Sequence, residues 1–256
     1  MGESVNKQEY FEEVPDNSSF ELSRSSWRKK IYESNPVENG VIQFQKYLDG
    51  NHYAYQWEWM GIPIIKLPDD VMVIQEFFYK YRPSAVIEVG VARGGGIALS
   101  ASLMKINEIK INILGIDLKI FPHTQKSLDS YLGTGVELIE CDSTSELAID
   151  AIKNFVVDEE LVLVILDSDH SHDHVLKELS DICPLLPIGS RVLVADTIIE
   201  YFVSENTNRS WAPGNSPASA LKQFLNNNDD WEIDIEWSRR AVISESRDGW
   251  IKRIKA

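Results

Sequence analysis

Short apolar runs alternate with helix-like segments through the centre of the chain. From residue 85 onward, runs rich in Val, Ile and Leu recur between segments whose apolar residues repeat every three or four positions. Parallel strands need a crossover connection, usually a helix, so this alternation predicts a doubly wound parallel sheet. The predicted strands are 85–90, 111–117, 135–140, 161–167 and 190–196, and the predicted helices are 96–107, 123–132, 145–156 and 171–185.

The pattern changes in the last part of the chain. After a loop rich in Asn, Ser, Pro and Gly at 204–217, a last helical segment continues to about Asn227. Residues 231–237 alternate apolar and charged side chains, which predicts an edge-type strand, and 248–254 is its predicted antiparallel partner. The complete prediction is an α/β fold with a mostly parallel, seven-stranded, doubly wound sheet of Rossmann-like type.

The segment before the sheet divides into stretches of different character. Residues 1–24 are polar and acidic, which predicts a loose or partner-stabilised arm, and 27–49 is amphipathic, which predicts a helical cap. Residues 52–63 are dense in aromatic side chains, which favours packing against the core over a lid above a substrate site. A further helix is predicted from Asp69, as its N-cap, to Arg82, where Pro83 ends it.

Charge and cysteine content narrow the class of partner. The 256 residues carry a formal net charge of −15, and no basic stripe offsets it. Binding to nucleic acid or to an anionic membrane surface is therefore disfavoured, and a small-molecule partner fits better. Cys141 and Cys183 each lie among apolar neighbours, which predicts reduced thiols and a cytoplasmic location, although a disulfide stays an alternative. We find no signal-peptide pattern or membrane-length apolar run.

The first predicted strand runs into a glycine-rich turn that is typical of a nucleotide site. Glu88 stands two residues before Gly90, and Arg93, Gly94 and Gly95 follow before the next helix. The dinucleotide fingerprint is matched only in part, because its third position is Ala92, so an NAD-type oxidoreductase is the alternative. An acid here would repel a diphosphate but suits a cationic ligand such as S-adenosylmethionine, with its sulfonium and ammonium groups. A plain tight turn between strand and helix is the less favoured alternative.

Acidic side chains end the next two strands. Ligands of doubly wound sheets bind beyond the carboxyl ends of the strands, so these residues are expected at one site. Asp117 can accept hydrogen bonds from ribose hydroxyls, and Asp142 with Ser143 suits an adenine amino group. Asp142 can equally cap the helix that follows it.

The fourth and fifth strands end in Asp167 and Asp196. Adjacent strands would bring these carboxylates side by side, where they repel unless a cation or a proton lies between them. A hard ion such as Mg²⁺ suits such an oxygen-rich site, and His170 is then the candidate general base for a substrate hydroxyl. The alternatives are helix caps for the acids and a zinc site for the histidines. We expect His172 and His174 to be solvated.

Together these motifs make the chain from about Trp59 onward resemble the cephalosporin hydroxylase/rhamnosyl O-methyltransferase family of class I S-adenosylmethionine-dependent methyltransferases. The resemblance rests on Trp59-x-Gly61-x-Pro63-x-x-Lys66-x-Pro68-x-Asp70, Glu88-Val-Gly90-Val-Ala-Arg93-Gly94-Gly95, Leu166-Asp167-Ser-Asp169-His170, Val194-Ala-Asp196-Thr197 and Pro213-Gly214. It implies a methyltransferase domain at 69–256 behind an N-terminal arm and cap at 1–68. It also implies Asp167 and Asp196 as Mg²⁺ ligands and His170 as the base.

Two positions depart from the family pattern. Ala195 stands where the family often has Glu, so one metal ligand is missing or is replaced by Thr197, Asp169 or water, and Gly96 stands where a serine is common. We expect O-methylation of a hydroxyl on a small molecule, such as a sugar or glycan unit. A non-catalytic cofactor-binding member of the fold is the alternative that Ala195 leaves open. The polar arm suggests a homo-oligomer, because a segment with few internal partners orders more easily against another subunit.

Overall fold

The structure is a computed structural model of the whole chain, and it describes residues 17–32, 35–202 and 210–255. Contacts between Cα atoms divide the chain into two compact units, Met1–Val41 and Ile42–Ala256. In the first unit, α2 (Asn17–Tyr32) is followed by the start of α3 (Asn35–Gly50), which continues into the second unit. No helix among the described residues is long and apolar enough to cross a membrane.

The N-terminal helices correct two predictions. Residues 17–24 belong to α2, so this part of the predicted arm is helical and not loose, and its first sixteen residues lie outside the described residues. The amphipathic stretch 27–49 contains the end of one helix and most of another. The second of these helices begins at Asn35, so Pro36 lies in its first turn, where a backbone N–H is not needed. The boundary proposed at residue 68 stays a prediction.

The aromatic stretch forms the 3₁₀ turn η1 (Tyr53–Gln56) and a hairpin of β1 (Trp57–Trp59) and β2 (Ile62–Ile64). Trp59 packs as expected, and its Nε1 donates a hydrogen bond to Ser102 Oγ at 3.1 Å. The packing prediction is wrong for Tyr55 and Trp57, which are 61% and 37% exposed. The hairpin is instead anchored by the aliphatic side chains of β2, because Ile62 and Ile64 are buried in the core.

Helix α4 (Pro68–Tyr81) begins one residue before the predicted cap. Leu67 is the N-cap, and Pro68 at the first helical position needs no N–H partner, so Asp69 caps nothing. The helix ends as predicted at Arg82, which takes a left-handed conformation with φ of 50°. Its core face consists of Val73, Ile74, Phe77 and Phe78.

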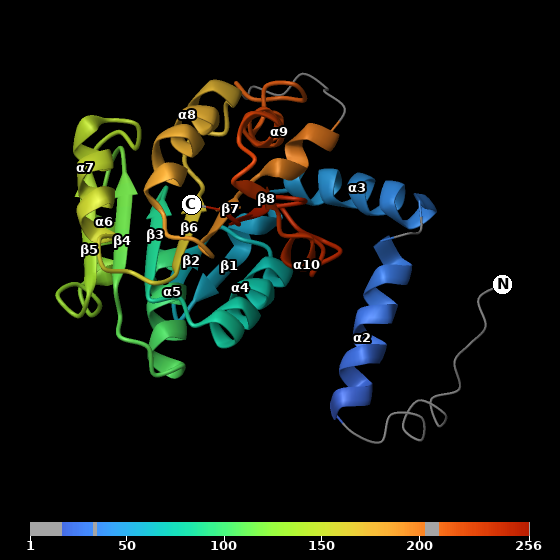
Figure 1. Cartoon of the computed structure of the whole chain (residues 1–256), viewed down its shortest axis with the longest axis horizontal. Helices are drawn as coiled ribbons and strands as arrows, with labels where there is room; N and C mark the ends of the chain where they lie inside the picture. The colour runs from blue at the N-terminus through green and yellow to red at the C-terminus, as the bar shows by residue number, and fades with distance from the viewer. Residues whose placement is uncertain (1–16, 33–34, 203–209, 256) are drawn as a thin grey trace. The chain divides into compact units, whose positions relative to one another are not determined.

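The seven-stranded sheet has the order β5-β4-β3-β6-β7-β9-β8, which confirms the predicted doubly wound architecture (Figure 1). The first five strands in this order are parallel, and β9 pairs antiparallel with both of its neighbours. The strands are β3 (Ala85–Val89), β4 (Ile113–Asp117), β5 (Val136–Glu140), β6 (Val162–Leu166), β7 (Arg191–Val194), β8 (Trp231–Ile233) and β9 (Trp250–Arg253). The antiparallel β9 inserted beside β7 distinguishes this sheet from the dinucleotide-binding strand order.

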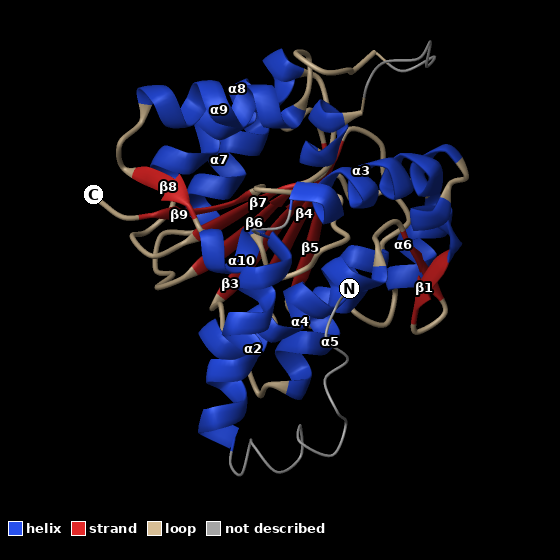
Figure 2. Cartoon of the chain, turned by 90° about the vertical axis from the view of Figure 1, so that its right-hand side faces the viewer, coloured by secondary structure: helices blue, strands red, loops and turns tan. Residues whose placement is uncertain are grey.

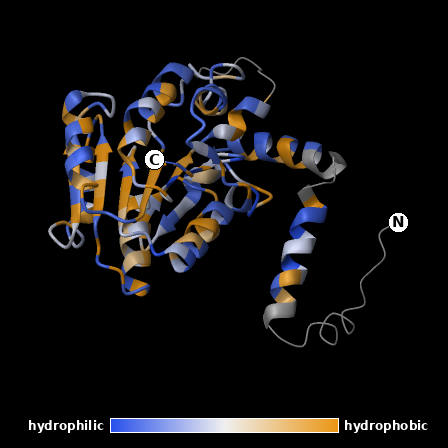
Figure 3. Ribbon diagram, in the orientation of Figure 1, coloured by the Kyte–Doolittle hydropathy of each residue, from blue (hydrophilic) through white to orange (hydrophobic). Residues whose placement is uncertain are grey.

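Helices cover both faces of the sheet (Figure 2). One face packs against α7 (Glu146–Phe155), α8 (His172–Ile182) and α9 (Pro217–Asn227), and the other against α4, α5 (Gly95–Ile106) and α6 (Pro122–Leu128). Alternate residues of β3 serve the two cores: Ala85 and Ile87 face the first, and Val86 faces the second. Because both faces are covered, the central strands are almost uniformly hydrophobic (Figure 3).

The predicted strand at 231–237 is only half correct, whereas its predicted antiparallel partner at 248–254 is confirmed as β9. Strand β8 ends at Ile233, and α10 (Ile235–Ser238) takes the rest of the predicted 231–237 segment. Asp234 between them is buried and accepts a hydrogen bond from Arg191 Nε at 3.2 Å. Trp237 then packs edge-on against Phe77, with ring centroids 5.3 Å apart. These tertiary contacts override the local alternation of apolar and charged residues.

Candidate active site

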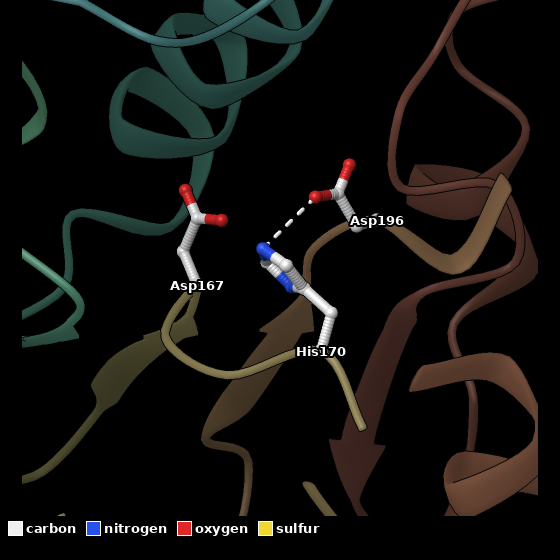
Figure 4. Close-up of side chains that lie close together, drawn as sticks. All are labelled: Asp167, His170 and Asp196. Atoms are coloured by element: carbon white, nitrogen blue, oxygen red, sulfur yellow. Dashed lines mark ion pairs between the residues drawn. The ribbon is translucent and has the colours of Figure 1, made fainter. Parts of the chain in front are cut away.

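Parallel strands place their carboxyl ends at one edge of the sheet, and the candidate site lies there. Asp167 follows β6 directly, Asp196 follows β7 with φ of 54°, and His170 lies in the loop between β6 and α8. His170 Nε2 is 3.1 Å from Asp196 Oδ2. One ligand atom from each of the three side chains lies within 4.8 Å of the others, and Figure 4 shows them converging. The structure therefore brings together the three residues predicted for metal binding and proton transfer.

The charges of this acid cluster, Asp167, His170 and Asp196, influence one another. Burial raises the pKa of Asp196, the nearby His170 lowers it, and the negative charge of Asp167 raises it further. A carboxyl in this position gains from a neighbouring cation, which would relieve the repulsion between the two acids. The arrangement is thus suited to a divalent ion as well as to an imidazolium.

Lys66 is a member of the site to which the sequence assigned no role. Its side chain is only 4% exposed, and Nζ lies 2.9 Å from Asp167 Oδ2 and 3.7 Å from Glu245 Oε1. Burial alone would lower the pKa of Lys66, but Asp167, Glu245 and Glu88 together hold it above its ordinary value. The ammonium therefore stays charged and fixes one oxygen of Asp167.

Glu245 reaches the site from the loop before β9 and was not predicted at all. Asp70, near the start of α4, accepts hydrogen bonds from Ser244 Oγ at 2.5 Å and from the Glu245 backbone N–H at 2.9 Å. Burial raises the pKa of Asp70 to about 6, although both hydrogen bonds oppose the shift. The sequence held one signal for a role of Lys66 and Asp70 in the site, because both belong to the first motif shared with the family, Trp59 to Asp70.

Glu88 ends β3 in a fully enclosed position. Its Oε2 is buried and has no hydrogen-bond partner among the described residues. Burial raises the pKa of Glu88 to about 8, while Lys66 lowers it and Asp167 raises it. A Cβ on Gly96 would lie 2.0 Å from Glu88 Oε1, so the space that a serine would need at residue 96 is filled by this carboxyl.

A cavity of about 460 Å³ extends from Asp167, one member of the acid cluster, over the ends of β3, β4, β5 and β6, a size common for small-molecule sites. Gly90, with φ of 96°, lets two strand ends approach, because a Cβ there would lie 2.0 Å from the carbonyl oxygen of Asp167. The predicted residues that line the cavity are Gly90, Asp117, Asp142, Ser143 and Asp167. Glu88, Arg93, Gly94 and Gly95 are not among its described lining residues.

The two acids predicted to contact a nucleoside already hold backbone groups. Asp117 accepts hydrogen bonds from the N–H groups of Ala92 and Lys119, each at 2.9 Å. Asp142 accepts from the Thr144 N–H at 2.8 Å, and this bond, with one from the Thr144 hydroxyl, lowers the pKa of Asp142. Asp142 does not cap the helix, because the N-cap of α7 is Ser145.

Other candidate residues point to different partners. Arg93 Nη1 lies 2.8 Å from His123 Nε2 on the exposed surface. His172 Nδ1 lies 2.7 Å from Ser219 Oγ on α9, and His174 Nε2 lies 3.0 Å from Glu178 Oε1, so these two histidines are structural and not merely solvated. The group of possible metal ligands found among the described residues contains His170 but neither His172 nor His174, which speaks against a three-histidine zinc site.

Trp211 is a further lining residue that sequence analysis missed. It lies in the loop before α9, and its ring meets His170 edge-on with centroids 5.0 Å apart. A tryptophan inside an otherwise polar loop was the signal that could have identified it.

Comparison with known proteins gives consistent matches. The family described as Rhamnosyl O-methyltransferase/CmcI matches residues 51–254. The rhamnosyl O-methyltransferase of Mycobacterium leprae (strain TN) is 26% identical over 226 residues, which cover 85% of this chain and 92% of that protein. An apo structure of CmcI superposes with a TM-score of 0.57 at 20% identity, over 79% of this chain and 78% of that one. A CmcI structure described as Mg-SAM gives a TM-score of 0.56 at 19% identity, over 78% and 77%.

Proposed function

The chain belongs to the rhamnosyl O-methyltransferase/CmcI family, and from this premise we propose that it transfers the methyl group of S-adenosylmethionine to a hydroxyl of a sugar-like small molecule. The observation that carries the proposal is the double position of Asp167. This residue lines the 460 Å³ cavity and also belongs to the acid cluster with His170 and Asp196. A methyl donor in the cavity and an acceptor at the cluster would therefore be neighbours, as direct transfer requires.

The cavity fits a cationic nucleoside. Asp117, Asp142, Asp167 and Asp169 line it, so it attracts the sulfonium and ammonium groups of S-adenosylmethionine. We assign cofactor binding to Gly90, Asp117, Asp142, Ser143 and Asp167, with Glu88, Arg93, Gly94 and Gly95 supporting the turn.

The acid cluster fits a divalent ion. Asp167 and Asp196 offer oxygen ligands, which Mg²⁺ prefers, and waters or acceptor oxygens would complete the coordination that Ala195 cannot supply. Bound Mg²⁺ would lower the pKa of the acceptor hydroxyl and orient it. Lys66 holds the second oxygen of Asp167, which leaves the first free to face the cluster.

His170 is the proposed general base. With Nε2 directed at Asp196, the carboxylate orients the imidazole, and the lone pair of Nδ1 stays available for a proton. Trp211 packs against the ring and limits its movement. Asp196 would thus help to position the base as well as the metal.

The acceptor is proposed to be an uncharged or weakly charged hydroxyl compound such as a sugar or glycan unit. The net charge of −15 disfavours nucleic acid, and the relative in Mycobacterium leprae is named for a rhamnosyl acceptor. A second cavity of about 50 Å³ also reaches Asp196 and is lined in part by Leu67, Ile198 and Glu245. This mixed apolar and carboxylate lining suits one edge of a sugar, such as a hydroxyl with its neighbouring C–H group, because the space is too small for a whole ring.

Calorimetric titration and a labelled-methyl assay test this proposal. Saturable binding of S-adenosylhomocysteine, followed by methyl transfer to sugar-nucleotide, glycan-sugar or phenolic pools, is the expected result. Binding of NAD without binding of S-adenosylhomocysteine would support the alternative, an NAD-type oxidoreductase. Binding of S-adenosylhomocysteine without turnover on any acceptor would instead support a non-catalytic member of the fold.

Two further proposals concern the state of the protein in the cell. Cys141 and Cys183 are both free thiols, which supports the proposed cytoplasmic location. We also propose self-association, on the basis of the polar N-terminal segment. Light scattering at micromolar protein concentration tests self-association, and a monomeric mass would refute it.

A further inference from the structure

A buried carboxylate beside the cavity is used neither by the glycine turn nor by the acid cluster. Glu178, on α8, is 1% exposed. Its Oε1 accepts hydrogen bonds from Ser143 Oγ and Ser168 Oγ, each at 2.6 Å, and lies 3.0 Å from His174 Nε2. Its Oε2 is buried without a hydrogen-bond partner among the described residues. Oε1 therefore accepts from both serine hydroxyls and lies within hydrogen-bonding distance of the His174 ring.

The three partners of Oε1 come from different parts of the cavity wall. Ser143 follows β5, Ser168 follows β6, and His174 lies in the first turn of α8. All three line the cavity, whereas Glu178 lies behind them. One buried side chain therefore ties three segments of the wall together, and it does so from a single helix position.

The direction of these hydrogen bonds decides what the wall offers to a ligand. A serine hydroxyl has one hydrogen and two lone pairs. Because Ser143 and Ser168 both donate their hydrogen to Glu178, their oxygens can only accept from a molecule in the cavity. His174 Nε2, which lies 3.1 Å from Ser143 Oγ, is engaged in the same network and adds no free donor from that nitrogen.

We propose that Glu178 is a positioning residue that makes this cavity select a purine with an amino group, by holding Ser143 and Ser168 as hydrogen-bond acceptors. The inference rests on the proposed function, in which the ligand is S-adenosylmethionine. The adenine amino group donates hydrogen bonds, whereas hypoxanthine carries a carbonyl oxygen at the same place and would meet acceptors. Burying two acceptors against each other leaves both unsatisfied, which costs binding free energy.

Isothermal titration with S-adenosylhomocysteine and with S-inosylhomocysteine tests the proposal without relying on turnover. The wild-type protein should bind the adenine compound at least about tenfold more tightly, the ratio expected for one mismatched buried hydrogen bond. In Glu178→Met the serine hydrogens are free to turn into the cavity, and the ratio should fall to within about threefold. Glu178→Gln should keep the preference, because an amide oxygen in the Oε1 position can still accept from both serine hydroxyls.

Asp173→Met is the matched control, since it removes an exposed carboxylate from the same helix and should leave the ratio unchanged. If Glu178→Met fails to fold, as judged by thermal melting, Ser143→Ala replaces it and should lower the ratio by removing one acceptor. An unchanged ratio in the folded variant, or an equal loss in Glu178→Gln, overturns the inference. Absence of S-adenosylhomocysteine binding to the wild type would refute the proposed function instead, so the two failures are distinguishable.

Discussion

In the cavity, the polar side chains hydrogen-bond to the chain itself, whereas the acid cluster at its rim holds negative charge that the chain balances only in part. Asp117 and Asp142 hold backbone N–H groups, so their geometry is set before any ligand arrives. At the rim, by contrast, burial raises the pKa of Asp196. Burial also raises the pKa of Glu245, well above its ordinary value. One region is prepared for a ligand by hydrogen bonds, and the other is left in need of a cation.

This difference suggests that the two regions fail in different ways when they are altered. Loss of a side chain from the cavity should weaken cofactor binding. Loss of one from the rim should affect metal binding, proton transfer or folding while the cofactor still binds. The predictions below separate these outcomes, beginning with the largest expected effect.

Asp196→Ala should abolish metal-dependent methyl transfer, a loss of at least about 10³-fold, because a metal ion supplies several kcal/mol of stabilisation to the developing charge. S-Adenosylhomocysteine affinity, measured by titration calorimetry, should stay close to that of the wild type, since Asp196 does not line the 460 Å³ cavity. Removal of metal with EDTA should reproduce the loss, and Mg²⁺ should restore activity only in the wild type. Activity that survives EDTA would refute the metal assignment.

His170→Ala should lower kcat by roughly 10²- to 10⁴-fold, the usual contribution of a general base. Mn²⁺ binding followed by electron paramagnetic resonance should persist, because both carboxylates remain. His123→Ala is the control, because His123 lies outside the acid cluster, and it should leave turnover unchanged. Normal turnover of His170→Ala would show that another group accepts the proton.

Lys66→Met should destabilise the protein by about 3–5 kcal/mol, because it leaves the Asp167 carboxylate partly buried without its cation. Urea unfolding measures the effect. Lys80→Met is the matched control: its ammonium pairs with Glu236 at 2.7 Å, but both side chains are 47% exposed, so the loss should stay within about 1 kcal/mol. Equal effects of the two substitutions would mean that burial of Lys66 contributes nothing to stability.

Stability should also depend on pH, with an effect of similar size that is spread over several pH units. Burial raises the pKa of Glu88 from 4.5 to about 8, so the folded protein binds this proton more tightly than the unfolded chain does. The associated stability is present in full below about pH 4.5 and is lost as the pH rises toward 8, by an amount on the order of a few kcal/mol. Glu88→Gln should flatten this decline in urea unfolding of the ligand-free protein.

Asp70→Asn provides an internal comparison for the same measurement. Its pKa is raised from 3.8 to about 6, so the stability linked to Asp70 is lost between these values and not at higher pH. The Asn variant should remove the decline at low pH and leave the one that extends to pH 8. Burial of Glu245 contributes to the same decline, so a Glu88→Gln protein that declines as steeply as the wild type between pH 6 and 8 would contradict the assignment to Glu88.

The sequence alone determined the sheet, its strand ends and the acid cluster. Apolar runs separated by helical segments predict parallel strands, and parallel strands place their carboxyl ends together, so Asp167, His170 and Asp196 could be expected as neighbours. The turn after β3 could also be predicted, because its glycines indicate a turn, and Gly90 and Gly94 both have a positive φ. These features depend on local periodicity and on topology, both of which a sequence expresses directly.

Only the tertiary structure decided which side chains surround those residues. Lys66, between β2 and α4, pairs both with Asp167 and with Glu245 from the loop before β9, and no spacing in the chain relates the three. The partners of Glu178 were equally hidden from the sequence. On α8 it is one polar residue among others, and only the fold brings Ser143 and Ser168 to its carboxylate. Periodicity predicts whether a side chain faces inward. The partners of that side chain come from segments far away in the sequence, and only packing brings those segments together.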